Sequence, residues 1–426
     1  MKIKNIKAIS TNKEREVALA IAEAGYDAID TRRAIERGFK FEKDVLFIQG
    51  KFISLKHVDR IFVVGAGKCS VDAGEAMEKI LGDRLTDGII VGICEGGLKK
   101  IKTFCGTHPF PTQINVEATS AIIKMLEGLT ERDLVIFLIS GGGSTLLCQP
   151  QKMTCEDEST ILKKLFEKGA TIEEINVLRK HLSSARGGFL AQYAYPAKVV
   201  SYIFSDVPGD DIRFVASGPT VKDTTTVKDA KKILDTFNIE KEIGFEVPLF
   251  ETPKEDKYFE HVWNTLIVSN TVALQAMADK ARELGFVPVI KTSTLAGEAR
   301  ELGVAIVNEL HTVESKTVLL YGGEPTVTIH KPGKGGRGLE LVLSGVNEIQ
   351  VGELLMSLAS DGRDNTDFAG ALCDIMTKEK ARQMDLDPIH HIEENASYAF
   401  FEKVGDYIST GNTGSNVSDL IVAIKI

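Results

Sequence analysis

The sequence predicts an α/β protein made of two domains. Apolar, β-branched stretches alternate along the chain with segments whose apolar residues recur at helical spacing. Such alternation is typical of a mostly parallel sheet with helices on both faces. A chain of 426 residues is also too long for one typical hydrophobic core. We therefore expect two α/β domains, the first of them Rossmann-like.

The first half of the chain shows the alternation in order. Helical spacing over 11–37 predicts one or two entry helices. Gly169 is a typical helix C-cap, and Thr171 with Glu174 has the pattern of a capped helix start. The expected strands are 61–64, 88–93, 134–139 and 198–204, and the expected helices that follow the entry segment are 71–81, 116–129 and 156–168.

The stretch 245–261 mixes proline, glutamate, lysine and aspartate without periodicity, so the domain boundary is placed there. The predicted domains are 1–245 and 262–426. The second contains expected strands at 265–268, 287–290, 317–321, 354–358 and 420–424, and expected helices at 272–284, 296–310 and 339–349. The sequence leaves open which domain the entry helices contact.

The composition excludes several classes of protein. A formal net charge of −9 argues against a nucleic-acid partner or an anionic membrane surface. No run of about 18 apolar residues suits a membrane span, and the first ten residues lack the apolar core of a signal peptide. Six cysteines without a CxxC pair are typical of reduced thiols. We expect a cytoplasmic monomer or homodimer that acts on a small molecule.

Glycine-containing polar loops follow five of the apolar stretches. Ligands of open α/β sheets bind beyond the carboxyl ends of strands, so five such loops favour one large polar ligand. Glycine lets backbone N–H groups approach an oxyanion, and Lys68, Arg213 and Arg337 are available to balance its charge. The pattern indicates phosphate chemistry. The five segments are 61–70, 135–147, 199–211, 318–327 and 356–367.

The loop GAGKCS places Lys68 at a helix start but fits no standard nucleotide motif. A Walker A loop needs glycine where Phe62 stands, and a dinucleotide fingerprint needs glycine at Ser70. A lysine at a helix N-terminus adds positive charge to a site already suited to anions. The alternative is a surface lysine on a tight turn.

The loop SGGGST is more specific. Gly141, Gly142 and Gly143 fit a backbone nest that binds phosphate oxygens, and Ser144 and Thr145 add hydroxyls. The alternative is a flexible strand-to-helix turn.

Two acidic loops are candidates for binding Mg²⁺. Asp206 ends an apolar strand, where it is placed to hold Mg²⁺, to accept a substrate proton, or only to stabilise an Asx turn. The loop SDGRDNTD offers Asp361, which we take as the second metal candidate.

Two further loops carry charged groups suited to phosphoryl transfer. The loop GGEPTV contributes Glu324, a candidate for the phosphate site. Arg337 on a glycine-rich loop suits stabilisation of charge that develops on a phosphoryl group.

A lone histidine such as His108 is more often structural than catalytic.

The order of these motifs resembles that of the type II glycerate 2-kinases, over a span from about Glu14 to Ile424. The motifs are VGAGKCS, THPFP, SGGGSTL, INVLRKHLS with RGG, SDVPGDD, ASGP, GGEPTV, GGRGLE, SDGRDNTD and TGSNVSDLIV. The resemblance implies a glycerate-kinase N-terminal part, a C-terminal MOFRL part and an active site in the interdomain cleft. It also implies ATP- and Mg²⁺-dependent phosphorylation of D-glycerate, generally at the 2-hydroxyl. The family's key lysine falls on Lys68 and its key arginine on Arg337.

The chain departs from the family pattern at three loops. Similar enzymes usually read GGRNQE where this chain has GGRGLE, so an amide pair beside Arg337 is missing. Their aspartate loop resembles DGTDGPTDAAG, whereas this chain reads DGRDNTDFAG, with Arg363 inside it. Asn412 and Ser418 stand where proline and asparagine are commoner. Such changes alter the recognition of hydroxyl and carboxylate groups.

The leading hypothesis is a kinase that converts D-glycerate to 2-phosphoglycerate. Lys68, Arg337 and Asp206 are the expected catalytic residues, and Lys68, His108 and Arg179 are expected to bind the substrate carboxylate. One alternative is an NAD(P)H-dependent hydroxypyruvate reductase, which the absent dinucleotide fingerprint disfavours. Another is a non-catalytic protein that binds a phosphorylated metabolite.

Overall fold

The computed structural model describes residues 1–42, 44–48, 51–93 and 96–426. The chain forms two compact units, each with its own six-stranded sheet. The parallel-sheet unit comprises Ala34–Ser205 and Asp211–Ile267, and the mixed-sheet unit comprises Met1–Arg33, Asp206–Asp210 and Val268–Ile426. Both units are α/β, as predicted.

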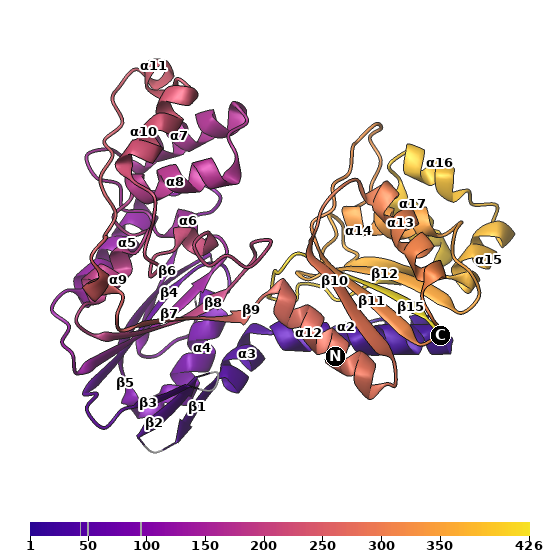
Figure 1. The fold of residues 1–426 in the computed structure, drawn as a ribbon, viewed down its shortest axis with the longest axis horizontal. Coiled ribbons are helices and arrows are strands. Elements are labelled where there is room, and N and C mark those ends of the chain that lie inside the picture. The colour runs from indigo at the N-terminus through magenta and orange to yellow at the C-terminus, as the bar shows by residue number, and fades with distance from the viewer. Residues whose placement is uncertain (43, 49–50, 94–95) are drawn as a thin grey trace. The chain divides into compact units, whose positions relative to one another are not determined.

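The parallel-sheet unit has the strand order β6-β5-β4-β7-β8-β9 (Figure 1). Its strands β4 to β8 run parallel to one another. The central strand β7 is buried along its whole length, which explains its continuous apolar sequence. The strands are β4 (Arg60–Ala66), β5 (Leu85–Gly92), β6 (Ile101–Cys105), β7 (Asp133–Ser140), β8 (Lys198–Phe204) and β9 (Val262–Val268).

Helices follow these strands, and a small antiparallel sheet precedes them. The helices are α4 (Ser70–Leu81), α5 (Gln113–Leu126), α6 (Gly143–Leu146), α7 (Cys155–Glu167), α8 (Ile172–Leu182), α9 (Phe189–Ala194), α10 (Val227–Thr236) and α11 (Ile239–Ile243). The small sheet was not predicted from the sequence; its strands are β1 (Phe39–Glu42), β2 (Val45–Ile48) and β3 (Lys51–Ser54). The sixth cysteine, Cys94, lies outside the described residues, and the other five are free thiols.

The mixed-sheet unit has the strand order β10-β11-β15-β12-β13-β14. Strands β10 and β11 are parallel, whereas β15 is antiparallel to both of its neighbours, β11 and β12. The strands are β10 (Val287–Leu295), β11 (Thr317–Gly323), β12 (Glu353–Ala359), β13 (Gly370–Asp374), β14 (Tyr407–Ile408) and β15 (Asp419–Lys425).

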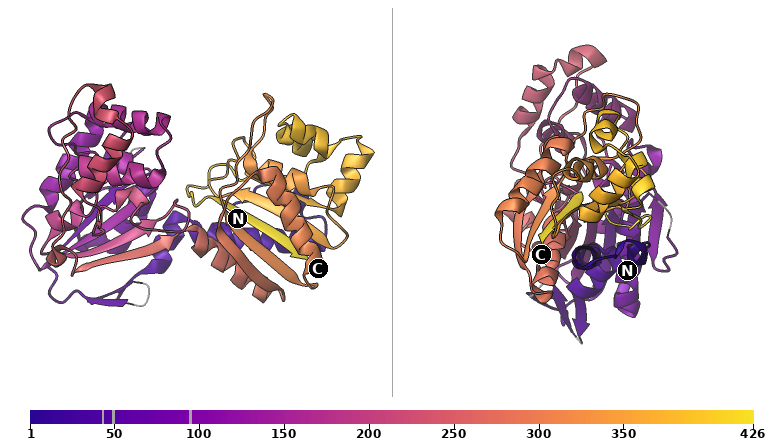
Figure 2. Two further views of the ribbon diagram at one scale, coloured as in Figure 1. Left: turned by 45° about the horizontal axis from the view of Figure 1, so that its top comes forward. Right: turned by 90° about the vertical axis from the view of Figure 1, so that its right-hand side faces the viewer.

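Helices cover both faces of this mixed sheet (Figures 1 and 2). On one face lie α2 (Lys13–Ile29) and α12 (Asn270–Glu283), and on the other lie α13 (Ala299–Thr312) and α14 (Arg337–Gly345). The remaining helices of the unit are α1 (Ile6–Ile9), α15 (Ile375–Gln383), α16 (Pro388–Glu393) and α17 (Ser397–Val404), while α3 (Thr31–Gly38) spans the division between the two units.

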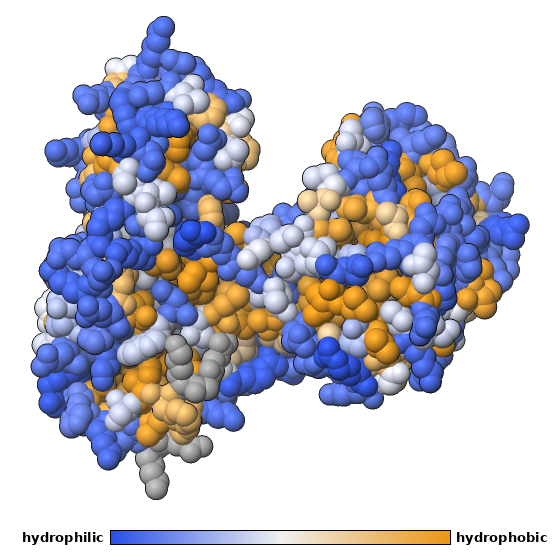
Figure 3. Space-filling view, viewed as in Figure 1, coloured by the Kyte–Doolittle hydropathy of each residue, from blue (hydrophilic) through white to orange (hydrophobic). Residues whose placement is uncertain are grey.

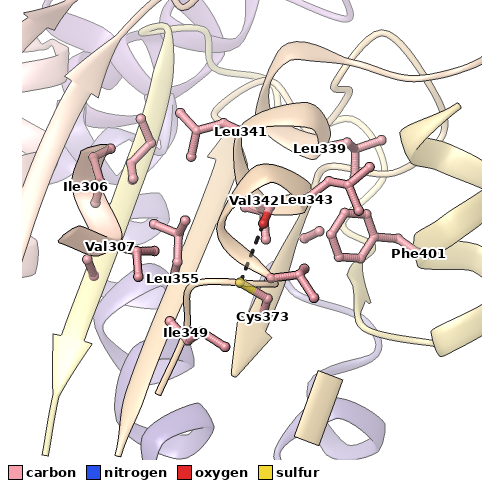
Figure 4. Close-up of a cluster of buried hydrophobic side chains, with 14 of the residues drawn as sticks. Ile306, Val307, Leu339, Leu341, Val342, Leu343, Ile349, Leu355, Cys373 and Phe401 are labelled. Atoms are coloured by element: carbon pink, nitrogen blue, oxygen red, sulfur yellow. Dashed lines mark hydrogen bonds between the residues drawn. The ribbon is translucent and has the colours of Figure 1, made fainter. Parts of the chain in front are cut away.

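Helix α14 lies in the centre of the main core of this unit. Every residue from Gly338 to Gly345 is buried. In Figure 4, side chains of α14 lie between Phe401 of α17 and the sheet strand that carries Leu355. The Cys373 thiol also donates a 3.5 Å hydrogen bond to the carbonyl oxygen of Val342 in α14. A helix packed on all sides has a fixed position, so its first residue, Arg337, has a fixed backbone.

The surface of each unit follows the usual division between polar and apolar residues. Figure 3 shows mainly hydrophilic residues on the visible face, with separate apolar patches. None of the helices in the described part of the chain is long and apolar enough to cross a membrane.

The long entry helix α2 belongs to the mixed-sheet unit, whereas α3 is divided between the two units, which answers the question that the sequence left open. Arg15 of α2 is fully buried, and its guanidinium donates to both Asp374 and Asp406 at 2.7 Å. Burial by itself raises the pKa of Asp374, but the hydrogen bonds and charge of Arg15 outweigh it and lower this pKa. The units thus divide the chain differently from the ranges 1–245 and 262–426, because the first 33 residues pack against the C-terminal part.

Replacing Arg15 is expected to destabilise the mixed-sheet unit. Arg15→Met removes a shared partner from two buried carboxylates, of which only Asp406 keeps a second cation among the described residues, Lys380 at 2.8 Å. We expect this change to cost about 3 to 5 kcal/mol of unfolding free energy. Because the folded-state pKa of Asp374 is lowered, this stabilisation is present at neutral pH and is lost as the pH falls below about 4. Denaturant unfolding at several pH values measures the effect.

The matched control is Arg132→Met, since Arg132 pairs with Asp59 on the surface and both side chains are more than half exposed. We expect this control to change the unfolding free energy by less than about 1 kcal/mol. Equal losses in the two variants, or a loss in Arg15→Met that does not change with pH, would contradict the interpretation.

Candidate active site

Lys68 lies in the loop between β4 and α4 of the parallel-sheet unit. Its backbone N–H donates to the carbonyl oxygen of Gly141 at 2.9 Å, so this loop is joined to the loop after β7. Gly67 permits the approach, because a Cβ there would lie 2.0 Å from the hydroxyl of Ser140. The ammonium group of Lys68 has no carboxylate partner among the residues that the structure describes.

The glycine loop SGGGST lies directly beside Lys68. Gly142 has φ = 81°, a left-handed conformation that favours glycine. A Cβ on Gly142 would lie 3.1 Å from the Lys68 side chain and 3.3 Å from His108. Within the described structure, the backbone N–H groups of Gly141, Gly142 and Gly143 have no protein acceptor. Adjacent free N–H groups of this kind can bind an anion.

A second loop packs against the glycine loop. The hydroxyls of Ser144 and Ser217 lie 3.0 Å apart. A Cβ on Gly143 would lie 2.6 Å from the Cβ of Ala216, so the two loops meet closely. Thr145 Oγ1 donates to the carbonyl oxygen of Pro109 at 3.3 Å, which joins the loop that carries His108 to the same edge.

Arg179 adds a third basic group. It lies on α8, which begins with the predicted capping box of Thr171 and Glu174. Burial, followed by the charge of Arg186, lowers the pKa of Arg179 to about 10. Arg186 itself pairs with buried Glu158 at 2.5 Å, whereas no ion pair to the Arg179 guanidinium occurs in the described part of the chain.

The pKa of His108 is lowered by burial and by this positive charge. Burial has the larger effect, and the charges are those of Lys68 and Arg179. The imidazole is therefore neutral near pH 7 and able to donate one hydrogen bond. The structure thus brings together Lys68, His108, Arg179 and the glycine loop, and we call this group the cation cluster.

A cavity of about 1130 Å³ lies in the mixed-sheet unit. Its lining comes mainly from three segments: the loop between β11 and α14 with the start of that helix, the loop that follows β12, and the one that precedes β15. Asn395, between α16 and α17, completes it. These segments meet because β15 is antiparallel, which places its first residue, Asp419, opposite Gly323 and Ala359, the last residues of β11 and β12. The cavity is lined by the carboxylates of Glu324, Glu340, Asp361, Asp364, Asp367 and Asp419 and by the guanidinium groups of Arg337 and Arg363.

Arg337 is held at this cavity by two carboxylates. Its Nε donates to Asp419 Oδ2 at 2.6 Å, and its Nη2 donates to Asp419 Oδ1 at 3.3 Å and to Glu324 Oε1 at 3.2 Å. Burial raises the pKa of Asp419 to about 7, against the opposing charge of Arg337. Glu324 and Asp364 add to that rise.

Asp364 caps the helix that begins at Arg337. Its side chain accepts from the backbone N–H groups of Gly338 at 3.1 Å and Leu339 at 2.6 Å. Gly336 is needed here, because a Cβ would lie 2.3 Å from the Asp364 carboxyl carbon. Burial raises the pKa of Asp364, and these two N–H groups oppose the rise.

The two predicted metal ligands, Asp361 and Asp206, lie on two different loops. Asp361 lines the cavity and accepts the backbone N–H of Arg363 at 2.9 Å. Asp206 belongs to the short segment that clusters with the mixed-sheet unit. No group of three or more His, Cys, Asp or Glu side chains in the described ranges is arranged to hold a metal ion. Arg213, expected to balance ligand charge, instead pairs with Asp211 of its own loop.

Two residues that shape the site did not stand out in the sequence. Asp364 is one of three aspartates in the loop SDGRDNTD, and Asp419 ends the polar glycine loop 410–419, so no motif distinguished either from its neighbours. Asp419 directly precedes the expected strand 420–424, and this position at the sheet edge was a usable signal.

Comparisons with known proteins cover nearly the whole chain. Residues 17–248 match a family described as a domain of unknown function, DUF4147, and residues 317–419 match the MOFRL family. A glycerate 2-kinase of Pyrococcus horikoshii is 37% identical over 96% of this chain and 97% of its own length. A putative hydroxypyruvate reductase of Agrobacterium vitis is 37% identical over 85% of this chain and 86% of its own.

A solved structure agrees with the sequence relatives. The crystal structure of a glycerate kinase from Thermotoga maritima superposes with a TM-score of 0.87 at 32% identity, and covers 96% of this chain and 99% of its own. Matches of this extent span both units, and the family predicted from the motif order is confirmed. The chain, which carries both the DUF4147 part and the MOFRL part, belongs to the glycerate 2-kinase family.

Proposed function

We propose that this protein is a glycerate 2-kinase that transfers the γ-phosphoryl group of ATP to the 2-hydroxyl of D-glycerate. The observation that carries the proposal is the cation cluster. Among the described residues Lys68 has no carboxylate partner and lies beside the free N–H groups of the glycine loop, and the charges of Lys68 and Arg179 both lower the pKa of His108. Uncompensated positive charge of this kind is stabilised by an anionic ligand. Glycerate and the phosphates of ATP are such ligands.

The parallel-sheet unit contributes the groups proposed to bind the two substrates. The N–H groups of the glycine loop bind phosphate oxygens, with Ser144 and Thr145 adding hydroxyls. Lys68, His108 and Arg179 bind the glycerate carboxylate, and neutral His108 does so as a hydrogen-bond donor.

The chemical step is an in-line displacement at the γ-phosphorus. The 2-hydroxyl oxygen forms the new P–O bond, the bond to the β,γ-bridging oxygen breaks, and ADP leaves. Asp206 accepts the hydroxyl proton, and Arg337 neutralises the charge on the transferring group.

The carboxylate of Asp361, which lines the cavity, is the group that would hold Mg²⁺. The ion prefers hard oxygen ligands and usually takes only one or two carboxylates together with substrate phosphates, so a single carboxylate there fits it. When bound, Mg²⁺ supplies charge neutralisation on the phosphates.

A panel of small hydroxy acids tests the activity. The protein is incubated with ATP, Mg²⁺ and each acid, and the products are resolved by ³¹P NMR. We expect D-glycerate to be the best acceptor and 2-phosphoglycerate to be the product. The name carried by the Agrobacterium vitis relative gives a second candidate, so a parallel reaction with hydroxypyruvate and NADH is followed by absorbance. NADH oxidation without ADP formation would show that the protein is a reductase and not a kinase.

Ligand binding without ADP formation or NADH oxidation would favour the non-catalytic alternative.

Removing Arg337 is expected to slow the chemical step. Arg337→Ala lowers kcat on the order of a thousandfold, because the charge that develops on the phosphoryl group loses its partner. The KM for ATP changes much less, since nucleotide phosphates bind at the glycine loop. Steady-state kinetics measures both parameters. Arg132→Ala, which removes a surface arginine, is expected to retain the wild-type kcat, and an unchanged kcat in Arg337→Ala would remove the assigned role.

Removing Lys68 is expected to raise the pKa of His108. The charge of Lys68 lowers this pKa in the wild type, so Lys68→Met moves it toward its usual value. D-glycerate bound to the wild type moves it in the same direction, because a carboxylate favours the charged imidazole. An NMR titration of the imidazole measures both shifts. Lys164→Met serves as the control, since Lys164 is paired with Glu167 on the exposed side of α7. If the pKa of His108 is the same in the wild type, Lys68→Met and Lys164→Met, Lys68 does not act on His108 and the cation cluster is wrong.

A further inference from the structure

We propose that Asp419 is a positioning residue that holds the Arg337 guanidinium in the orientation from which it acts. The inference rests on the proposed function, because it takes Arg337 to be the group that meets the transferring phosphoryl group. Beyond that function, it names Asp419 as the residue that fixes Arg337, and it identifies the guanidinium nitrogen that remains available to a ligand.

The hydrogen bonds of Arg337 divide its guanidinium into a held edge and an open edge. Nε and Nη2 face Asp419, and Nη2 also reaches Glu324. Nη1 has no acceptor among the described residues. A guanidinium is planar and carries two donors on Nη1, so fixing Nε and Nη2 also fixes the direction of both. Nη1 is therefore the nitrogen available to a ligand in the cavity.

Asp419 is the rigid member of the two carboxylates. It is the first residue of β15 and is paired with Gly323 on one side and Ala359 on the other. Its side chain is 3% exposed, whereas that of Glu324, on the loop after β11, is 44% exposed. A carboxylate fixed by the sheet on both sides can define an orientation, while an exposed loop carboxylate adapts to it.

The other charged groups near Asp419 make it depend on Arg337. Asp364 and Glu324 are both acidic and both disfavour the charged form of Asp419, so Arg337 is the group that stabilises it. Truncating either partner thus leaves the other in an unfavourable environment, and the two residues behave as one unit. Residues that act as a unit show non-additive effects on rate.

A double-mutant cycle tests the proposal directly. Asp419→Asn keeps the shape but removes the charge and one of the two acceptors. We expect it to lower kcat about 10- to 100-fold, with the KM values for D-glycerate and ATP changed less than about threefold. In the Arg337→Ala background the same substitution is expected to change kcat less than about twofold. Effects that multiply would show that Asp419 does not act through Arg337.

A chemical rescue adds a second measurement. Free guanidinium added to Arg337→Ala is expected to restore part of kcat, because Asp419 still provides the pairing edge. The double variant is expected to need at least several-fold more guanidinium for the same gain. Equal rescue in the two proteins would overturn the proposal.

The matched control is Asp133→Asn in the parallel-sheet unit. Asp133 is also a buried first residue of a strand, and it pairs through both oxygens with Arg60 at 2.7 and 2.8 Å. We expect this control to lower the melting temperature by an amount similar to Asp419→Asn but to leave kcat unchanged. If both variants lower kcat equally, loss of stability explains the effect and the positioning role is wrong.

A spectroscopic readout separates this inference from the proposed function. The Nε–H of Arg337 donates to a buried carboxylate, so its proton resonance is expected to be sharp and slow to exchange in the wild type and lost in Asp419→Asn. Asp419→Glu, which keeps the carboxylate, is expected to recover it partly. A wild type inactive on glycerate would overturn the proposed function alone. An Arg337 resonance that is unchanged in Asp419→Asn would overturn the inference, whatever the activity.

Discussion

The site in the mixed-sheet unit depends on the direction of one strand. Because β15 runs antiparallel to β11 and β12, the loop that precedes it reaches the same sheet edge as the loops that follow its neighbours. Asp419 is thereby fixed opposite the ends of both strands, and it can pair with the first residue of α14. A parallel β15 would place Asp419 at the far edge and leave Arg337 without its buried partner.

The parallel-sheet unit builds its site by a different principle. Its loops all follow parallel strands, so they reach the same sheet edge without an antiparallel strand. Whether these loops can meet then depends on how closely their backbones can approach. Gly67 and Gly143 allow loops after β4, β7 and β8 to meet without side-chain collision. Among the described residues, Lys68 and Arg179 form no ion pair at this edge, and their charges add to burial in lowering the pKa of His108. This edge therefore gains stability when an anion binds.

Much of this arrangement was predictable from local patterns. The strand β8 has the predicted bounds 198–204, and the capping box at Thr171 is present as predicted. The glycine loops and Lys68 were recognisable because glycine and lysine at strand ends are chemically distinctive. The pairing of Arg337 with Asp419 was not predictable, because the two residues are separated by 82 positions and meet only through the order and direction of strands. The small sheet β1-β2-β3 was missed because its strands have four residues each, too few for a periodic pattern.

Two arginines of the mixed-sheet unit show how an ion pair that satisfies every donor differs from one that leaves a donor for a ligand. Arg15 uses all three of its nitrogens on Asp374, Asp406 and neighbouring acceptors, and its side chain is fully buried. Arg337 is also bound by two carboxylates, but it is one-third exposed at a cavity and its Nη1 meets no acceptor in the part of the chain that the structure describes. Satisfying every donor stabilises the folded state and leaves nothing for a ligand. A nitrogen that has no protein acceptor at an open cavity is free to donate to a ligand, which is what the role proposed for Arg337 requires.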